Sequence, residues 1–165
     1  MPAFFVLGEL TVTSQTDLPI RIAQPHEADA IAALARAAYA RWVPVLGREP
    51  RPMMADYRAA FAGFRFDVIE AGGRIVASLQ TQPREGHFWV ESIAVAPELQ
   101  GQGVGLRLLA QAELLARAAG RDEIRLLTNG KMAANRRLYA MVGYAEDLEE
   151  PFADGTVVYL SKRLR

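Results

Sequence analysis

Apolar residues recur along this chain with two different spacings, and the spacing indicates which elements the sequence predicts. Alternating or short continuous apolar runs are typical of strands, whereas apolar residues three and four positions apart are typical of helices. Strands are predicted over residues 20–23, 66–71, 75–82, 87–96, 124–128, 144–148 and 156–161. Helices are predicted over residues 27–40, 53–61, 104–119 and 132–142, and the proline-rich segment 41–52 is predicted to be a loop or a broken helix.

The order of these elements predicts an α+β fold in one domain. Gly72-Gly73 and a turn at residues 83–86 join three successive strands, which favours an antiparallel meander. Helix 104–119 then crosses over to a strand that is expected to be a parallel neighbour. We expect a mixed central sheet of about six to seven strands flanked by about four helices, formed by residues 18–165.

The N-terminal segment, residues 1–17, is expected to be a tail or an extra edge strand. Its apolar run from Ala3 to Leu7 has neither the basic flank nor the length of a signal peptide.

The most distinctive stretch of the chain lies between the strand 87–96 and the helix that follows it. The strand has to end at Pro97, which cannot continue a β-ladder, and apolar residues at helical spacing begin at Val104. Glycines at positions 101, 103 and 105 remove the Cβ atoms that would keep a ligand away from the backbone. A glycine turn that leads into a helix offers unpaired N–H groups and the positive end of a helix dipole, which suits a phosphate group.

Other interpretations of this turn are weaker or stay open. A P-loop needs a Lys followed by Ser or Thr after its last glycine, but Leu106 and Arg107 follow here. The dinucleotide fingerprint Gly-x-Gly-x-x-Gly is one residue longer than the spacing found. The residues alone leave open a tight turn without a ligand and a nucleotide-phosphate site on the same N–H groups.

The whole pattern Val95-x-Pro97-x-x-Gln100-x-x-Gly103-x-Gly105 resembles the acetyl-CoA-binding signature of the GNAT N-acetyltransferases. The resemblance covers roughly residues 20–161 and implies the GNAT acyl-CoA N-acyltransferase fold. It also implies that acetyl-CoA is the cosubstrate, that no metal is used, and that a primary amine attacks the thioester directly.

The resemblance assigns roles to the backbone around the turn. The pyrophosphate is expected on six residues: Gln100, Gly101, Gln102, Gly103, Val104 and Gly105. The pantetheine is expected along Ile93, Ala94 and Val95, with the N–H group of Val95 facing the thioester oxygen. Such binding requires the strands 87–96 and 124–128 to splay apart, so that the edge of the first is unpaired.

The helix predicted to begin at Met132 carries two further candidates. Asn135 and Tyr139 are four residues apart and therefore share a face. The run from Asn135 to Tyr144 resembles a family segment in which the Asn contacts CoA and the Tyr protonates the leaving thiolate. The alternatives are that Tyr139 borders the core face of the helix and that Asn135 is a surface amide.

A carboxylate interrupts the apolar strand that precedes the turn. Strict alternation places four of its side chains on one face: Trp89, Glu91, Ile93 and Val95. Burial there would make Glu91 a stronger base, and a base is needed because an amine with a pKa of ~10.4 must lose a proton near pH 7. Pairing of Glu91 with an arginine is the alternative, and His87 is the reserve base.

Composition narrows the classes of function. With 19 basic and 19 acidic residues the net charge is zero, so no nucleic-acid partner is predicted. The chain of 165 residues has no cysteine, which excludes an acyl-cysteine intermediate and fits direct transfer. Its two histidines are far apart, which disfavours a histidine-rich metal site. No apolar stretch approaches the ~20 residues of a membrane span, and we expect a cytoplasmic enzyme without a membrane partner.

The acceptor amine is not identified by the sequence. The resemblance implies that residues 39–57 and 146–156 shape its pocket. These segments contain three aromatic residues (Tyr39, Trp42 and Tyr57) and three carboxylates (Glu149, Glu150 and Asp154). Such a mixture would suit a cationic small molecule or peptide.

Three arginines, Arg41, Arg136 and Arg137, are expected either to reach the phosphates of CoA or to stay in solvent. A non-catalytic acyl-CoA sensor of the same fold is the alternative to an enzyme, and a homodimer is also open.

Overall fold

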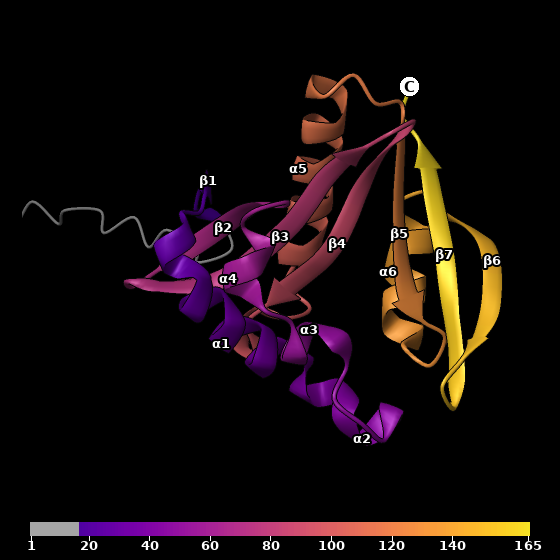
Figure 1. Ribbon diagram of the computed structural model, residues 1–165, viewed down its shortest axis with the longest axis horizontal. Coiled ribbons are helices and arrows are strands. Elements are labelled where there is room, and N and C mark those ends of the chain that lie inside the picture. The colour runs from indigo at the N-terminus through magenta and orange to yellow at the C-terminus, as the bar shows by residue number, and fades with distance from the viewer. Residues whose placement is uncertain (1–16) are drawn as a thin grey trace, which may run out of the picture.

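The computed structural model describes residues 17–165, so the tail or edge strand predicted for the N-terminus lies outside the described residues except for Asp17. The described chain forms a seven-stranded sheet in the order β1-β2-β3-β4-β5-β7-β6 (Figure 1). Its strands are β1 (Ile20–Ile22), β2 (Arg65–Ala71), β3 (Arg74–Arg84), β4 (His87–Val95), β5 (Glu123–Asn129), β6 (Ala145–Phe152) and β7 (Gly155–Arg163). The helices are α1 (Ala28–Tyr39), α2 (Val43–Leu46), α3 (Arg51–Met54), α4 (Tyr57–Ala60), α5 (Val104–Ala118) and α6 (Ala133–Met141).

The strand pairing confirms the predicted α+β fold. Strands β2, β3 and β4 are antiparallel neighbours, as expected for a meander. Strand β5 is parallel to β4, and α5 forms the crossover between them. The hairpin of β6 and β7 completes the sheet through the antiparallel pair of β5 and β7.

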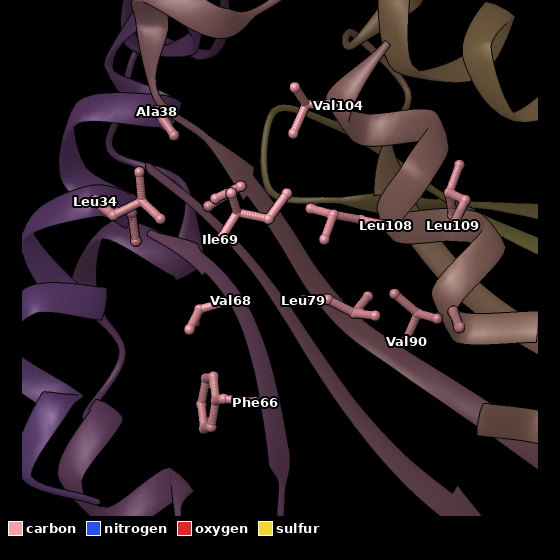
Figure 2. Packing of buried hydrophobic residues seen from close by; sticks show 14 of the residues in the cluster. Leu34, Ala38, Phe66, Val68, Ile69, Leu79, Val90, Val104, Leu108 and Leu109 are labelled. Atoms are coloured by element: carbon pink, nitrogen blue, oxygen red, sulfur yellow. The ribbon is translucent and has the colours of Figure 1, made fainter. Parts of the chain in front are cut away.

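Helices cover both faces of the sheet around β3. Six consecutive residues of β3, from Ile75 to Gln80, are buried, which requires cover on both sides of the strand. Figure 2 shows Leu34 of α1 on one side of the strands and Leu108 of α5 on the other, both pointing into the core. Because helices pack on either face, the middle of the sheet is rigid and the ligand-accessible positions lie at its open seam.

The segment before β2 is more broken than the sequence predicts. The single helix expected over residues 53–61 is two short helices, α3 and α4. Ala55 has extended backbone angles, and the Asp56 side chain accepts a hydrogen bond from the N–H group of Ala59, so Asp56 begins a new helix. Helix α2 also forms within the segment that was expected to be a loop or a broken helix.

The strand β4 contains a β-bulge that the sequence does not predict. Val90 pairs with Thr81 and Ser92 pairs with Gln80, so Glu91 is the extra residue. The predicted common face of Trp89, Glu91, Ile93 and Val95 is therefore wrong, because the bulge interrupts the alternation. The turn predicted at residues 83–86 is also shorter than expected, since β3 continues through Arg84.

No helix within residues 17–165 is long and apolar enough to cross a membrane.

Candidate active site

The seam between β4 and β5 is closed at one end and open at the other. Only Phe88 and Trp89 of β4 pair with β5, opposite Ile124 and Arg125. Beyond these residues the two strands diverge, and Figure 1 shows the gap widening toward the end of β4. The expected splay between these strands is therefore present.

The open edge of β4 exposes main-chain groups of Ile93 and Val95. The N–H group of Ala96 donates to the carbonyl of Val76 at 2.8 Å, and Ala94 pairs with Ser78. Because hydrogen bonding alternates along an antiparallel ladder, Ile93 and Val95 direct their main-chain groups away from β3 and into the seam. Ala94 instead faces β3, which leaves its expected contact with the cofactor without a main-chain donor.

Two side chains already bind the carbonyls on this edge. The hydroxyl of Tyr39 donates to the carbonyl of Ile93 at 2.8 Å. The Gln100 side-chain amide donates to the carbonyls of Val95 at 2.9 Å and of Ala38 at 3.1 Å. The N–H groups of Ile93 and Val95 are thus the donors that the edge offers to a ligand, and Gln100 ties the turn to β4 and α1.

The glycine turn supplies a second set of donors. Gly101 and Gly103 have positive φ angles of 76° and 86°, which favour glycine. Within residues 17–165 no protein acceptor binds the N–H groups of Gly101, Gln102 or Gly103. The first hydrogen bond of α5 runs from Arg107 to Gly103, so the N–H groups before Arg107 also lack an acceptor within the helix.

Gln100 differs from the other residues of the turn. Its N–H group donates to the carbonyl of Pro97 at 3.3 Å, so the free donors begin at Gly101 rather than at Gln100. Its contribution is the side-chain contact described above.

The turn, the open edge and α6 enclose one cavity of about 480 Å³. Ile93 and Val95 line it from β4, Gly101, Gly103 and Gly105 from the turn, and Asn135, Leu138 and Tyr139 from α6. Ala38, Tyr39, Arg41 and Trp42 close the side formed by α1. The structure therefore brings together the two segments that resemble the family signature, although they are about thirty positions apart in the sequence.

Tyr139 lines this cavity from α6. Its ring lies 5.8 Å from that of Tyr144, between their centroids. Desolvation in this environment raises the pKa of Tyr139 to about 12, and desolvation also raises the pKa of Tyr39 above its ordinary value. Both phenols are therefore hydrogen-bond donors across the physiological range.

Glu91 lies in a neighbouring cavity of about 300 Å³. Tyr57, Gln80 and Ser92 also line it. The Glu91 side chain is exposed and accepts a hydrogen bond from the indole N–H of Trp89 at 2.6 Å. The expected burial of Glu91 among apolar side chains is therefore wrong, because the bulge turns it toward solvent.

The three arginines considered as phosphate ligands differ in their contacts. Arg41 lines the large cavity, stacks over Trp42 at 4.7 Å and donates to Gln100. Arg136 is bound by Glu146 and Glu149, which removes it from the expected phosphate contact. Arg137 is exposed on α6.

The reserve base, His87, lies at the closed end of the seam beside Trp89. Desolvation and the nearby Arg125 lower the pKa of His87, but it lines none of the cavities described here. Within residues 17–165 no three histidine and carboxylate side chains are grouped closely enough to hold a metal ion.

Sequence reasoning named Tyr39 as an aromatic residue of the acceptor segment but did not single out Arg48 and Arg51, and all three residues line a third cavity. Tyr39 is also hydrogen-bonded to β4. The signal for the arginines was their place beside Pro50 and Pro52 in an apolar segment. An apolar segment of this kind is expected to pack on the core, and its arginines are then expected to lie close to the core as well.

The comparison with known proteins agrees with this arrangement. The model of the acetyltransferase (GNAT) family matches residues 30–144. A stretch of 65 residues is 43% identical to an amino-acid acetyltransferase of Ralstonia nicotianae. The match covers 38% of this chain and only 14% of that relative's length.

Solved structures share the fold at lower sequence identity. A ribosomal-protein alanine N-acetyltransferase from Escherichia coli matches with a TM-score of 0.70 and 20% identity, over 88% of this chain and 93% of that chain. The PaiA N-acetyltransferase of Thermoplasma acidophilum, solved in complex with coenzyme A, matches with a TM-score of 0.70 and 14% identity. That match covers 88% of this chain and 98% of the other.

Proposed function

Because this chain belongs to the acetyltransferase (GNAT) family, we propose that it transfers the acetyl group of acetyl-CoA to a primary amine by direct attack. The observation that carries the proposal is the meeting of two sets of free N–H donors in one cavity. One set is on the glycine turn, and the other is on the unpaired edge of β4.

Two features of the cavity support a CoA thioester as its ligand. A diphosphate matches the N–H groups at the start of α5, because partial positive charge gathers there. The positions of Gly101 and Gly103 have no atom within 4 Å of where a Cβ would lie, so the approach to the backbone is open. An extended amide chain matches the N–H groups of Ile93 and Val95, as a strand added to a free edge. The structure of the Thermoplasma acidophilum relative contains coenzyme A, which supports the same ligand class here.

The chemistry joins the acceptor nitrogen to the acetyl carbon, breaks the carbon–sulfur bond and releases a thiol. The N–H group of Val95 is proposed to stabilise the negative charge that develops on the carbonyl oxygen. Asn135 is proposed to contact CoA from α6, on the same side of the cavity as Tyr139.

Tyr139 is proposed to donate to the departing sulfur. Proton transfer from a phenol with a pKa of about 12 to a thiolate with a pKa near 8.5 is unfavourable by roughly 5 kcal/mol. Tyr139 therefore acts first as a hydrogen-bond donor, and its proton transfer is completed as the positively charged amine adduct loses its own proton. Glu91 is proposed to receive that proton through water, because it lies in the adjoining cavity and is exposed.

Two measurements on the purified protein test the proposal. Isothermal titration should show acetyl-CoA binding, and a thermal-shift comparison should show stabilisation by acetyl-CoA rather than by ATP or NAD. Thiol release in the presence of an amine panel should then show turnover that depends on the amine. Binding without turnover for any amine would favour an acyl-CoA sensor, and stabilisation by ATP alone would overturn the assignment.

A further inference from the structure

Two of the three carboxylates expected to attract a cationic acceptor, Glu149 and Asp154, are held by other groups. Glu149 accepts hydrogen bonds from Arg136 and from Thr156. Asp154 forms an ion pair with Lys131 at 3.2 Å. None of the predicted carboxylates, Glu149, Glu150 and Asp154, lines any of the three cavities described above. The expectation of a cation-binding acceptor pocket therefore has no support in the arrangement of these side chains.

The charge that faces the third cavity is positive. Arg48 and Arg51 line this cavity of about 110 Å³, and within residues 17–165 neither forms an ion pair or a side-chain hydrogen bond. The Nε atom of Arg48 is buried and has no hydrogen-bond partner among the described residues. The guanidinium of Arg48 lies over the ring of Phe152 at 5.5 Å, which orients it without neutralising its charge. Lys131 lowers the pKa of Asp154, and Arg48 contributes a minor part of that shift.

The rest of this cavity is mainly apolar. The apolar residues of its wall are Leu46, Pro50, Pro52, Leu127, Met132, Phe152 and Val157. A buried guanidinium nitrogen without an acceptor in apolar surroundings is unfavourable, because the lost hydration is not replaced. An anionic ligand group would replace it, and carboxylates suit the planar fork of an arginine.

The cavity shares wall residues with the site of the proposed reaction. Tyr39 and Asn135 line both this cavity and the large cavity beside the glycine turn. Arg51, Pro52 and Leu127 line both this cavity and the one that contains Glu91. Arg48 and the open edge of β4 are thus connected through residues that both cavities share, and the apolar wall lies beside Arg48.

We propose that the acceptor is a small primary amine that carries a carboxylate and an apolar side chain, as an apolar α-amino acid does, with the carboxylate bound by Arg48 and Arg51. This inference rests on the proposed acetyl transfer for the identity of the reacting group. It adds the substrate class and two specificity-determining residues. The name of the Ralstonia nicotianae relative is consistent with the same class, although only a small part of that protein is matched.

The test is a binding comparison on the full-length protein saturated with CoA, which prevents turnover. The probes are L-leucine and L-phenylalanine, each with its amide and its decarboxylated amine. We expect the amino acids to bind the native protein about 10- to 100-fold more tightly than the uncharged analogues, as the loss of a charge-assisted contact predicts. Arg48→Gln should remove this preference and leave the affinity for the decarboxylated amines within about threefold.

A matched control separates this effect from a general loss of charge. Arg58→Gln removes an exposed arginine of α4 that pairs with Asp29 away from the three cavities, and it should leave all affinities unchanged. With acetyl-CoA, Arg48→Gln should raise KM for the amino acids by a similar factor and change kcat little.

Two results would overturn the inference. One is that the native protein binds the amino acids no better than their amides, and the other is that Arg48→Gln weakens the binding of all probes equally. If isothermal titration shows that CoA itself does not bind, the proposed function is overturned instead. The same probe comparison without CoA then still decides whether Arg48 binds a carboxylate.

Discussion

The strand β4 runs along both ends of the seam between β4 and β5, but its main-chain groups have different roles at the two ends. At the closed end Phe88 is buried, and it pairs with Ile124, so the backbone there is used for structure. At the open end Ile93 and Val95 turn their N–H groups into a cavity, and the glycine turn adds more. The difference is whether a neighbouring strand satisfies the main-chain groups, since unpaired groups at an accessible edge are available to a ligand.

This contrast separates stability from binding. Changes at the closed end should lower the free energy of unfolding and leave cofactor affinity intact. Changes at the open end should lower cofactor affinity, by more than any accompanying loss of stability explains.

The largest expected effect is at the closed end. Phe88→Ala should lower the free energy of unfolding by about 3–5 kcal/mol, because it leaves a cavity in the core next to β5. Chemical denaturation measures this loss. The affinity of the remaining folded protein for acetyl-CoA should change less than about threefold. A loss below about 1 kcal/mol would contradict the assignment of this end to structure.

At the open end, Gly103→Val should weaken acetyl-CoA binding by about 100-fold or more, which corresponds to about 2.7 kcal/mol. Gly103 has a φ of 86°, which a valine does not adopt without strain, so the N–H groups of the turn would be redirected. Calorimetric titration measures the affinity.

Gly73→Val is the matched control for this change. Gly73 has a φ of 76° in the turn between β2 and β3, so the two substitutions introduce similar strain. Both should lower stability by about 1–3 kcal/mol, but only the change at Gly103 should lower affinity. Equal affinity losses in the two variants would show that backbone strain, rather than the anion site, is responsible.

Within the open end, Tyr139→Phe should lower kcat by about 100-fold and leave acetyl-CoA affinity nearly unchanged. Because burial raises the pKa of Tyr139 to about 12, its hydroxyl stays protonated below about pH 11. The ratio of native to variant kcat should therefore be constant from pH 6 to pH 10, as steady-state rates can show. Tyr159→Phe on β7 is the control, and a ratio that falls steeply across this range would contradict the role of a protonated donor.

The smallest expected effect is that of Glu91→Gln. Glu91 is exposed and held by Trp89, so solvent can replace it in part as a proton acceptor. We expect a decrease of about tenfold or less in kcat at pH 7, against no change for Glu150→Gln on β6. Rates of thiol release measure both. An unchanged rate for Glu91→Gln would remove Glu91 from the mechanism.

The sequence predicts the open end better than its surroundings because the glycine turn is encoded locally. Positive φ angles, the stop at Pro97 and the helical spacing after Val104 all act within a few residues. The bulge at Glu91 depends instead on the register of β4 against β3, which no local pattern in β4 reveals. This is why the orientation of Glu91 was predicted wrongly while the turn was predicted correctly.

The acceptor side was the least predictable part for a similar reason. Arg48 sits in a segment that the sequence predicts only as a loop or broken helix, and its cavity is completed by Phe152 and Leu127 from distant strands. The ion pairs that occupy Glu149 and Asp154 also join residues far apart in the chain or across a turn. Charge alone therefore suggests a cationic acceptor, whereas the structure pairs Glu149 and Asp154 and places Arg48 and Arg51 in the wall of the third cavity.

The central claim is that the N–H groups of the glycine turn and of the open edge bind a CoA thioester, and amide hydrogen exchange tests it most directly. On adding CoA, the amides of Ile93, Val95 and residues 101–106 should become protected, while those of Phe88 and Trp89 should not change. Protection that is confined to other parts of the chain, or an unchanged exchange rate at the turn under saturating CoA, would contradict the claim.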